Sequence, residues 1–143
     1  MREDLPTLRE PYRWTKAHSV NIAVLDKQHE RLFETMNELH QALRHGSGSA
    51  AIDLVLVRLV DYVQEHFAAE ESLMDHFAFP GFAAHKAEHE MFRKKLDGFL
   101  NDHRAEKAGV PVSVMLLMQS WRKDHVMTTD KQYSAFLNAL GVR

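Results

Sequence analysis

Residues 66–89 read HFAAEESLMDHFAFPGFAAHKAEH, and this stretch decides the fold. His66 and Glu70 stand four residues apart before its proline–glycine pair, and His85 and His89 repeat that spacing after it. Four residues along an α-helix rotate a side chain by only about 40°, so each pair projects from one helix face. Proline followed by glycine is a strong turn signal. The stretch therefore predicts a helical hairpin in which each helix carries a pair of metal-binding side chains.

The helical pattern continues on both sides of this hairpin. Apolar residues recur at three- and four-residue steps, which is typical of amphipathic helices, and no strand-like alternation interrupts them. Glycine- or proline-containing breaks separate four predicted helices, which cover residues 26 to about 45, 50 to about 79, 82–104 and the segment after 109–111. Four helices with short connections indicate an all-α, up-down-up-down antiparallel four-helix bundle.

Composition limits the class of protein. A chain of 143 residues fits one domain, which we divide into an irregular N-terminal arm (1–24) and a bundle (25–140). A formal charge of -2 and a pI near 6.5 give no electrostatic case for nucleic acid or anionic membrane as a partner. The chain contains neither a membrane-spanning apolar run nor a leader-type N-terminus, and it has no cysteine. We therefore expect a cytoplasmic protein.

Three further candidate metal ligands lie outside the hairpin: His29 in the first predicted helix, and His125 and Asp130 in the fourth. Antiparallel helices bring side chains to one level when these lie equally far from the connecting loop. His29 and the second-helix pair both lie roughly 25–30 Å from their loop, whereas the third and fourth helices disagree by roughly 10 Å. Imidazole and carboxylate donors without thiolate suit iron, manganese or zinc. Seven such donors exceed the needs of one ion and predict a dinuclear site.

The fourth helix cannot be regular if both of its candidate ligands serve that site. His125 and Asp130 are five residues apart, which corresponds to about 140° of rotation on an α-helix. A π-type turn or a break between them would bring both side chains to the same side. Thr128 and Thr129 are β-branched and bond readily to nearby backbone, so we expect the distortion there.

Five segments in this order resemble a single-domain bacterial hemerythrin, and the likeness extends from about residue 12 to residue 140: 14–18, 26–29, 66–71, 85–89 and 121–130. The resemblance implies two irons joined by an oxo or hydroxo bridge. It assigns His85, His89 and His125 to one iron, His29 and His66 to the other, and Glu70 and Asp130 to bridging positions. On this pattern a single octahedral position stays open, on the iron with two histidines, and dioxygen would bind there.

The function implied by the resemblance is reversible binding of dioxygen for storage, delivery or buffering, by a protein that is not an enzyme. We expect a monomer, because one bundle already encloses a complete site. Helical spacing places Phe33, Tyr62 and Trp121 one turn from the candidate ligands, as walls of the dioxygen pocket. Two alternatives remain open: an enzyme that uses the same centre to scavenge peroxide or nitric oxide, and a sensor of oxygen or iron that acts through partners. The Glu-x-x-His motif of ferritin-like di-iron proteins is absent.

A few residues need separate interpretation. Asn21 stands where hemerythrins commonly have glycine, which we expect to affect only the turn of the arm. Arg122 replaces a more usual apolar residue beside the pocket; its guanidinium either reaches solvent, which we favour, or admits water to the iron pair. Asp26, Glu65 and Glu88 are candidates to accept hydrogen bonds from the metal-binding histidines, with solvated charges as the alternative.

Overall fold

The computed structural model of the chain describes residues 12–46 and 48–143. These residues form helices and no strand, in this order: the 3₁₀-helix η2 (Lys16–His18), α1 (Ala23–Arg44), α2 (Ser49–His76), α3 (Phe82–Arg104), α4 (Val110–Ser120), the π-helix η3 (Trp121–Thr129) and α5 (Asp130–Ala139). Because α4, η3 and α5 follow one another without a break, they act as a single fourth rod. The predicted all-α fold is confirmed.

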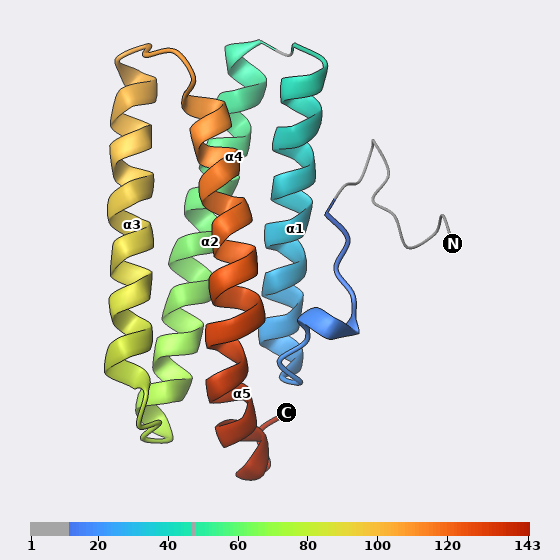
Figure 1. Cartoon of the computed structure of the whole chain (residues 1–143), viewed down its shortest axis with the longest axis vertical. Coiled ribbons are helices and arrows are strands. Elements are labelled where there is room, and N and C mark those ends of the chain that lie inside the picture. The colour runs from blue at the N-terminus through green and yellow to red at the C-terminus, as the bar shows by residue number, and fades with distance from the viewer. Residues whose placement is uncertain (1–11, 47) are drawn as a thin grey trace.

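The four rods run alternately up and down, and the connections between them lie at alternate ends of the bundle (Figure 1). α1 packs against α2 and α4, and α3 packs against α2 and against the fourth rod. The predicted up-down-up-down topology is therefore confirmed. None of the helices in the described part of the chain combines the length and the apolar character that a membrane crossing requires.

The entry into α1 departs slightly from the prediction. This helix begins at Ala23 rather than at Asp26, which places Asp26 in its first turn. Asp26 accepts a hydrogen bond from the backbone N–H of Val20 (2.8 Å) and one from the hydroxyl of Ser19 (2.5 Å). Asn21 has a left-handed backbone, with φ of 57°, which explains why glycine suits this position.

The interior consists of two apolar clusters with a polar layer between them. The larger cluster is built from residues such as Leu32, Met36 and Phe67, and the smaller one includes Met74 and Leu137. All five of these side chains are buried. The polar layer between the clusters contains the seven candidate metal ligands and is supported by apolar packing on both sides.

Candidate metal centre

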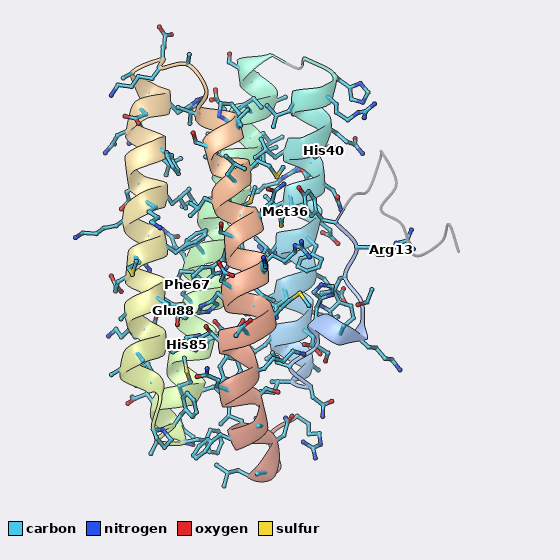
Figure 2. All side chains as sticks on the ribbon, in the orientation of Figure 1. Arg13, Met36, His40, Phe67, His85 and Glu88 are labelled. Carbon is cyan, nitrogen blue, oxygen red and sulfur yellow. The ribbon has the colours of Figure 1, made fainter. Side chains whose placement is uncertain are left out.

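The seven candidate ligands meet in this layer, and none of them is more than 2% exposed: His29, His66, Glu70, His85, His89, His125 and Asp130. Each of the four rods supplies at least one of them. Figure 2 shows His85 on α3 below Phe67 and well below His40 on α1. The fold thus brings together the residues that the sequence grouped as candidate ligands.

Helical spacing positions two of the ligand pairs. On α2, His66 Nε2 lies 3.2 Å from Glu70 Oε1, as expected for side chains one turn apart. On α3, the rings of His85 and His89 are 4.6 Å apart and nearly perpendicular, at 89°. Both pairs therefore point into the bundle without any distortion of their helices.

The fourth rod reaches the centre through the π-helix η3. This element carries His125 and ends immediately before Asp130, and it brings His125 Nε2 to 2.9 Å from Asp130 Oδ1. The hydroxyl of Thr128 bonds to the carbonyl of Lys123 (3.3 Å), and that of Thr129 bonds to the carbonyl of Asp124 (3.2 Å). The predicted π-type distortion is confirmed, and it extends over nine residues.

The levels of the third and fourth rods also agree. His89 precedes the end of α3 by as many residues as His125 follows the start of α4, so both reach the same depth. The offset of roughly 10 Å that the sequence predicted here is wrong. The reason is that the helix ends, at Arg104 and Val110, are separated by only a short turn, so both levels are measured from nearly the same point.

Two carboxylates occupy the middle of the layer. Glu70 Oε1 lies 3.2 Å from His66 Nε2 and 3.1 Å from His89 Nε2. Asp130 approaches the other side, with Oδ2 3.0 Å from His29 Nε2 and Oδ1 2.9 Å from His125 Nε2. Each carboxylate thus touches histidines from different rods, as a group shared between two ions would.

The donor atoms fall into two overlapping groups. One contains Glu70 with three histidines (85, 89 and 125), and the other contains Glu70 with Asp130 and two histidines (29 and 66); within each group the donor atoms lie within 4.8 Å of one another. Among the described residues, Nε2 of His29, His66, His85 and His125 and both oxygens of Asp130 are buried without a hydrogen-bond partner. Buried polar atoms rarely stay unpaired in a protein. The set therefore fits two N/O-liganded metal ions.

Burial and mutual charge set the ionisation of the cluster. Burial alone would raise the pKa of Glu70, but the surrounding imidazoles, His66 first, hold that pKa well below the usual carboxyl range. The pKa of Asp130 is lowered in the same way, chiefly by His125. Burial lowers the pKa of His66, whereas the nearby carboxylates of Asp130 and Glu70 outweigh burial and raise the pKa of His85 to about 9. Without metal, the carboxylates are thus ionised at neutral pH and His85 keeps a proton that a metal ion would replace.

Three of the histidines are held from outside by hydrogen bonds on Nδ1. A carboxylate and an amide oxygen can only accept, so in each case the imidazole donates. Acceptors are paired with histidines as follows: Gln28 with His66 (2.7 Å), Glu71 with His89 (2.7 Å) and Glu88 with His125 (3.0 Å). Such contacts fix the ring orientation and leave Nε2 free to bind metal.

The sequence identified only one of these three acceptors. Glu88 accepts a hydrogen bond from His125, as predicted by the first of the two roles considered for it. Asp26 instead binds the turn before α1, and Glu65 pairs with Arg31 (2.7 Å). Gln28 and Glu71 were missed. The sequence shows only that each stands directly beside a candidate ligand, and this position does not say which histidine of a neighbouring helix it contacts.

Tyr133 is a further residue that the sequence did not reveal. Its hydroxyl donates a hydrogen bond to Glu70 Oε2, and its ring is buried. It stands three residues after Asp130 and so shares a helix face with that carboxylate. This spacing could have indicated a contact with the centre.

Aromatic rings cover the polar layer. Trp121 stacks on His125 with ring centroids 3.6 Å apart at an angle of 10°, and Tyr62 lies 5.1 Å from His66 at 15°. Phe33 is buried, but its ring meets His18 of the arm rather than a candidate ligand. Two of the three predicted wall residues are therefore in ring contact with the cluster.

Arg122 turns away from the cluster. Its guanidinium carbon lies 5.7 Å from the centre of the Tyr12 ring, within cation–π range. The hydroxyl of Tyr12 accepts a hydrogen bond from Gln119, which keeps the ring in place. The charge of Arg122 thus packs on the arm, and its expected effect on the pocket stays a prediction.

Comparisons with known proteins agree with this arrangement. The family model described as the hemerythrin HHE cation binding domain matches residues 20–137. The chain is 35% identical over 124 residues to a bacteriohemerythrin of Stenotrophomonas maltophilia, covering 85% of this chain and 78% of the relative. It is 33% identical to a bacteriohemerythrin of Methylococcus capsulatus (88% and 96% covered) and 29% identical to a myohemerythrin of Theromyzon tessulatum (90% and 95% covered).

Proposed function

The chain belongs to the hemerythrin family, and from this premise we propose that it is a non-haem di-iron protein that binds dioxygen reversibly. The observation that carries the proposal is the pair of overlapping donor groups that share Glu70 in the buried layer. A family likeness alone identifies the fold, whereas this arrangement supplies the donor atoms that two ions need.

The proposed ligands divide between the two irons. His85, His89 and His125 hold one iron, and the other iron is held by His29 and His66. Glu70 and Asp130 bridge the pair, together with an oxo or hydroxo group. The side with two histidines has fewer protein donors, and we place the dioxygen position there. When bound, a ferrous pair supplies the two electrons that dioxygen takes up on binding.

The protein keeps this centre dry and fixes its ligands. Trp121 and Tyr62 cover two imidazoles, and Phe67 stacks on His89 with centroids 3.9 Å apart at 4°. Exclusion of water slows the loss of electrons from an oxygenated site, because polarity and access decide between binding and activation. Tyr133 holds the orientation of the Glu70 carboxylate through its hydroxyl.

One bundle contributes all the proposed ligands, so a second chain is not required to complete the centre. We therefore propose a monomer. Size-exclusion chromatography with light scattering on the iron-loaded protein tests this, and a stable dimer would contradict it.

The decisive experiment is to load the reduced protein with ferrous iron without air, count the iron and record the optical spectrum before and after exposure to air. Two irons per chain and a charge-transfer band that appears in air and disappears under vacuum over repeated cycles support a carrier. One iron per chain, or no change in air, contradicts the proposal. Rapid loss of the band with turnover of added peroxide would instead favour a scavenging enzyme.

A pair of matched variants ties the result to the cluster. His89→Ala removes a buried candidate ligand, and we expect it to lower the iron content and abolish the band. His45→Ala removes an exposed histidine outside the cluster and should bind iron as the unmodified chain does. Equal iron content in both variants would show that the metal binds elsewhere.

A further inference from the structure

Negative charge is distributed unevenly around the outer side of the cluster. Behind the group with three histidines stand two carboxylates, Glu71 on His89 at 2.7 Å and Glu88 on His125 at 3.0 Å. Glu88 also accepts hydrogen bonds from the hydroxyl of Thr129, at 3.0 and 3.2 Å, which fix its position. Figure 2 shows Glu88 on α3 just above His85.

In the group with two histidines, no carboxylate of the described residues accepts a hydrogen bond from the outer nitrogen of either imidazole. His66 donates its Nδ1–H to the amide oxygen of Gln28 at 2.7 Å, and both side chains are buried. Nδ1 of His29 has no hydrogen-bond partner among the described residues, and the same holds for Nδ1 of His85 in the other group, so the contrast rests on His66 against His89 and His125. The two halves of the centre therefore differ in the charge behind their histidines and not only in histidine number.

This difference has a direct consequence for a bound metal. A carboxylate that accepts the outer N–H of an imidazole makes its inner nitrogen a stronger donor, and the added donation favours the higher metal charge. Solvent weakens the effect at Glu88, whose side chain is 43% exposed. The guanidinium of Arg93 weakens it at Glu71, whose side chain is 17% exposed. Its direction persists because the amide of Gln28 carries no net charge.

On the basis of the proposed di-iron function, we propose that Glu71 and Glu88 are positioning residues that make the two irons unequal, so that the iron of His29 and His66 is reduced first. One electron from a dissolved reductant converts that iron from ferric to ferrous. A second electron then reduces the iron of His85, His89 and His125. The half-reduced pair thus keeps its electron on the side with fewer protein donors.

Stepwise potentiometric reduction of the iron-loaded full chain tests the inference, with Mössbauer spectra of the half-reduced sample. We expect two separate one-electron midpoints and one ferrous and one ferric signal. Glu88→Gln should raise the second midpoint more than the first. A tenfold change in the ferrous-to-ferric ratio corresponds to a shift of about 59 mV for one electron.

A reciprocal variant and a charge control sharpen the test. Gln28→Glu places a carboxylate behind His66 and should lower the first midpoint selectively. Asp97→Asn removes one exposed negative charge from the same helix as Glu88, and it should shift both midpoint potentials by the same small amount. If Gln28→Glu does not fold, Glu71→Gln replaces it, with a rise expected in the second midpoint.

Equal shifts of both midpoints in Glu88→Gln, no larger than those in Asp97→Asn, would overturn the inference. So would a half-reduced state with the electron shared by both irons. These outcomes differ from failure of the proposed function, in which the unmodified chain would not hold two irons at all.

Discussion

Two tyrosines border the metal centre, and their hydroxyls have opposite environments. The hydroxyl of Tyr133 donates to Glu70, whereas that of Tyr62 is buried without a hydrogen-bond partner among the described residues. Burial raises the pKa of both phenols well above the ordinary value, so both remain protonated. The two residues therefore form a natural pair for measuring what one hydrogen bond contributes to the centre.

Tyr133→Phe should lower the free energy of unfolding of the metal-free protein by about 1.5–3 kcal/mol, because a hydrogen bond to a charged acceptor is lost. It should also weaken iron binding, by roughly 10–100-fold. Urea unfolding and competition with a chelator measure the two effects. Tyr62→Phe is the control and should leave stability unchanged or slightly higher. A larger loss in Tyr62→Phe than in Tyr133→Phe would refute the assignment.

The ionisation of single residues predicts how the metal-free protein responds to pH. The pKa of His85 is raised to about 9, so its stabilising contribution is complete below its ordinary pKa of 6.5 and is lost as the pH rises through 9. The pKa of Glu70 is lowered, so its contribution is present above 4.5 and is lost as the pH falls further.

Stability of the metal-free protein should therefore fall from about pH 6.5 to 9, by at most about 1.4 kcal/mol per pH unit for one group. Urea titrations across this range measure the slope. The iron-loaded protein should lack the alkaline decline, because a coordinated imidazole no longer exchanges that proton. If the free energy of unfolding of the metal-free protein stays constant between pH 6.5 and 9, the charge assigned to His85 is contradicted.

At the residue scale, the sequence predicted the positions that meet in the centre but few of their outer contacts. Spacing along a helix determines which side chains share a face, and this was enough for His85 with His89. The contacts of Gln28 and Glu71 depend on how neighbouring helices are rotated against each other. No pattern within one helix contains that information.

At the scale of elements, the π-helix η3 decides whether the fourth rod can serve the centre. Its extra residue places His125 and Asp130 on one side, which a regular helix would not do. Inserting one alanine after Thr128 would place the two ligands six residues apart and rotate one of them away by about 100°.

We expect the insertion variant to remain helical by circular dichroism but to bind fewer than two irons per chain. Thr128→Ala keeps the length of the rod and serves as the control; it should bind iron normally. Full iron content in the insertion variant would mean that the rod adjusts elsewhere and that the geometry of η3 is dispensable.

Helix boundaries were predictable to the extent that they depend on local signals. The third helix was predicted at 82–104 and is found at Phe82–Arg104, between a proline–glycine turn and a short polar turn. The five-residue spacing between His125 and Asp130 predicted a distortion of the fourth rod, but it did not predict how many residues the distortion covers. That extent depends on hydrogen bonds such as the one from Thr129 to Glu88 on α3, which only the assembled bundle provides.

At the scale of the whole molecule, the polar layer is the weak point of an otherwise apolar interior. Its unpaired donor atoms cost stability unless a metal satisfies them. The clusters above and below, with residues such as Leu32 and Met74, do not depend on metal. We therefore expect the metal-free protein to stay folded but to be less stable.

Removal of iron with a chelator under reducing conditions should lower the melting temperature by on the order of 5–10 °C. Free metal at a hundredfold excess over its dissociation constant contributes about 2.7 kcal/mol, and 1 kcal/mol corresponds to about 2–4 °C at this size. Calorimetry before removal, after it and after iron is restored measures the effect. Unchanged melting would indicate that the metal contributes nothing to the fold.

The parallel contact of Trp121 with the His125 ring gives the molecule a built-in optical reporter. Iron one imidazole away should quench the emission of this indole, whereas the other tryptophan, Trp14, lies in the arm and provides a steady background. Stopped-flow fluorescence could then follow metal entry in real time, with Trp121→Phe as the silent counterpart. A dim holo-protein that brightens as iron leaves would turn the occupancy of the centre into a signal readable without a dye.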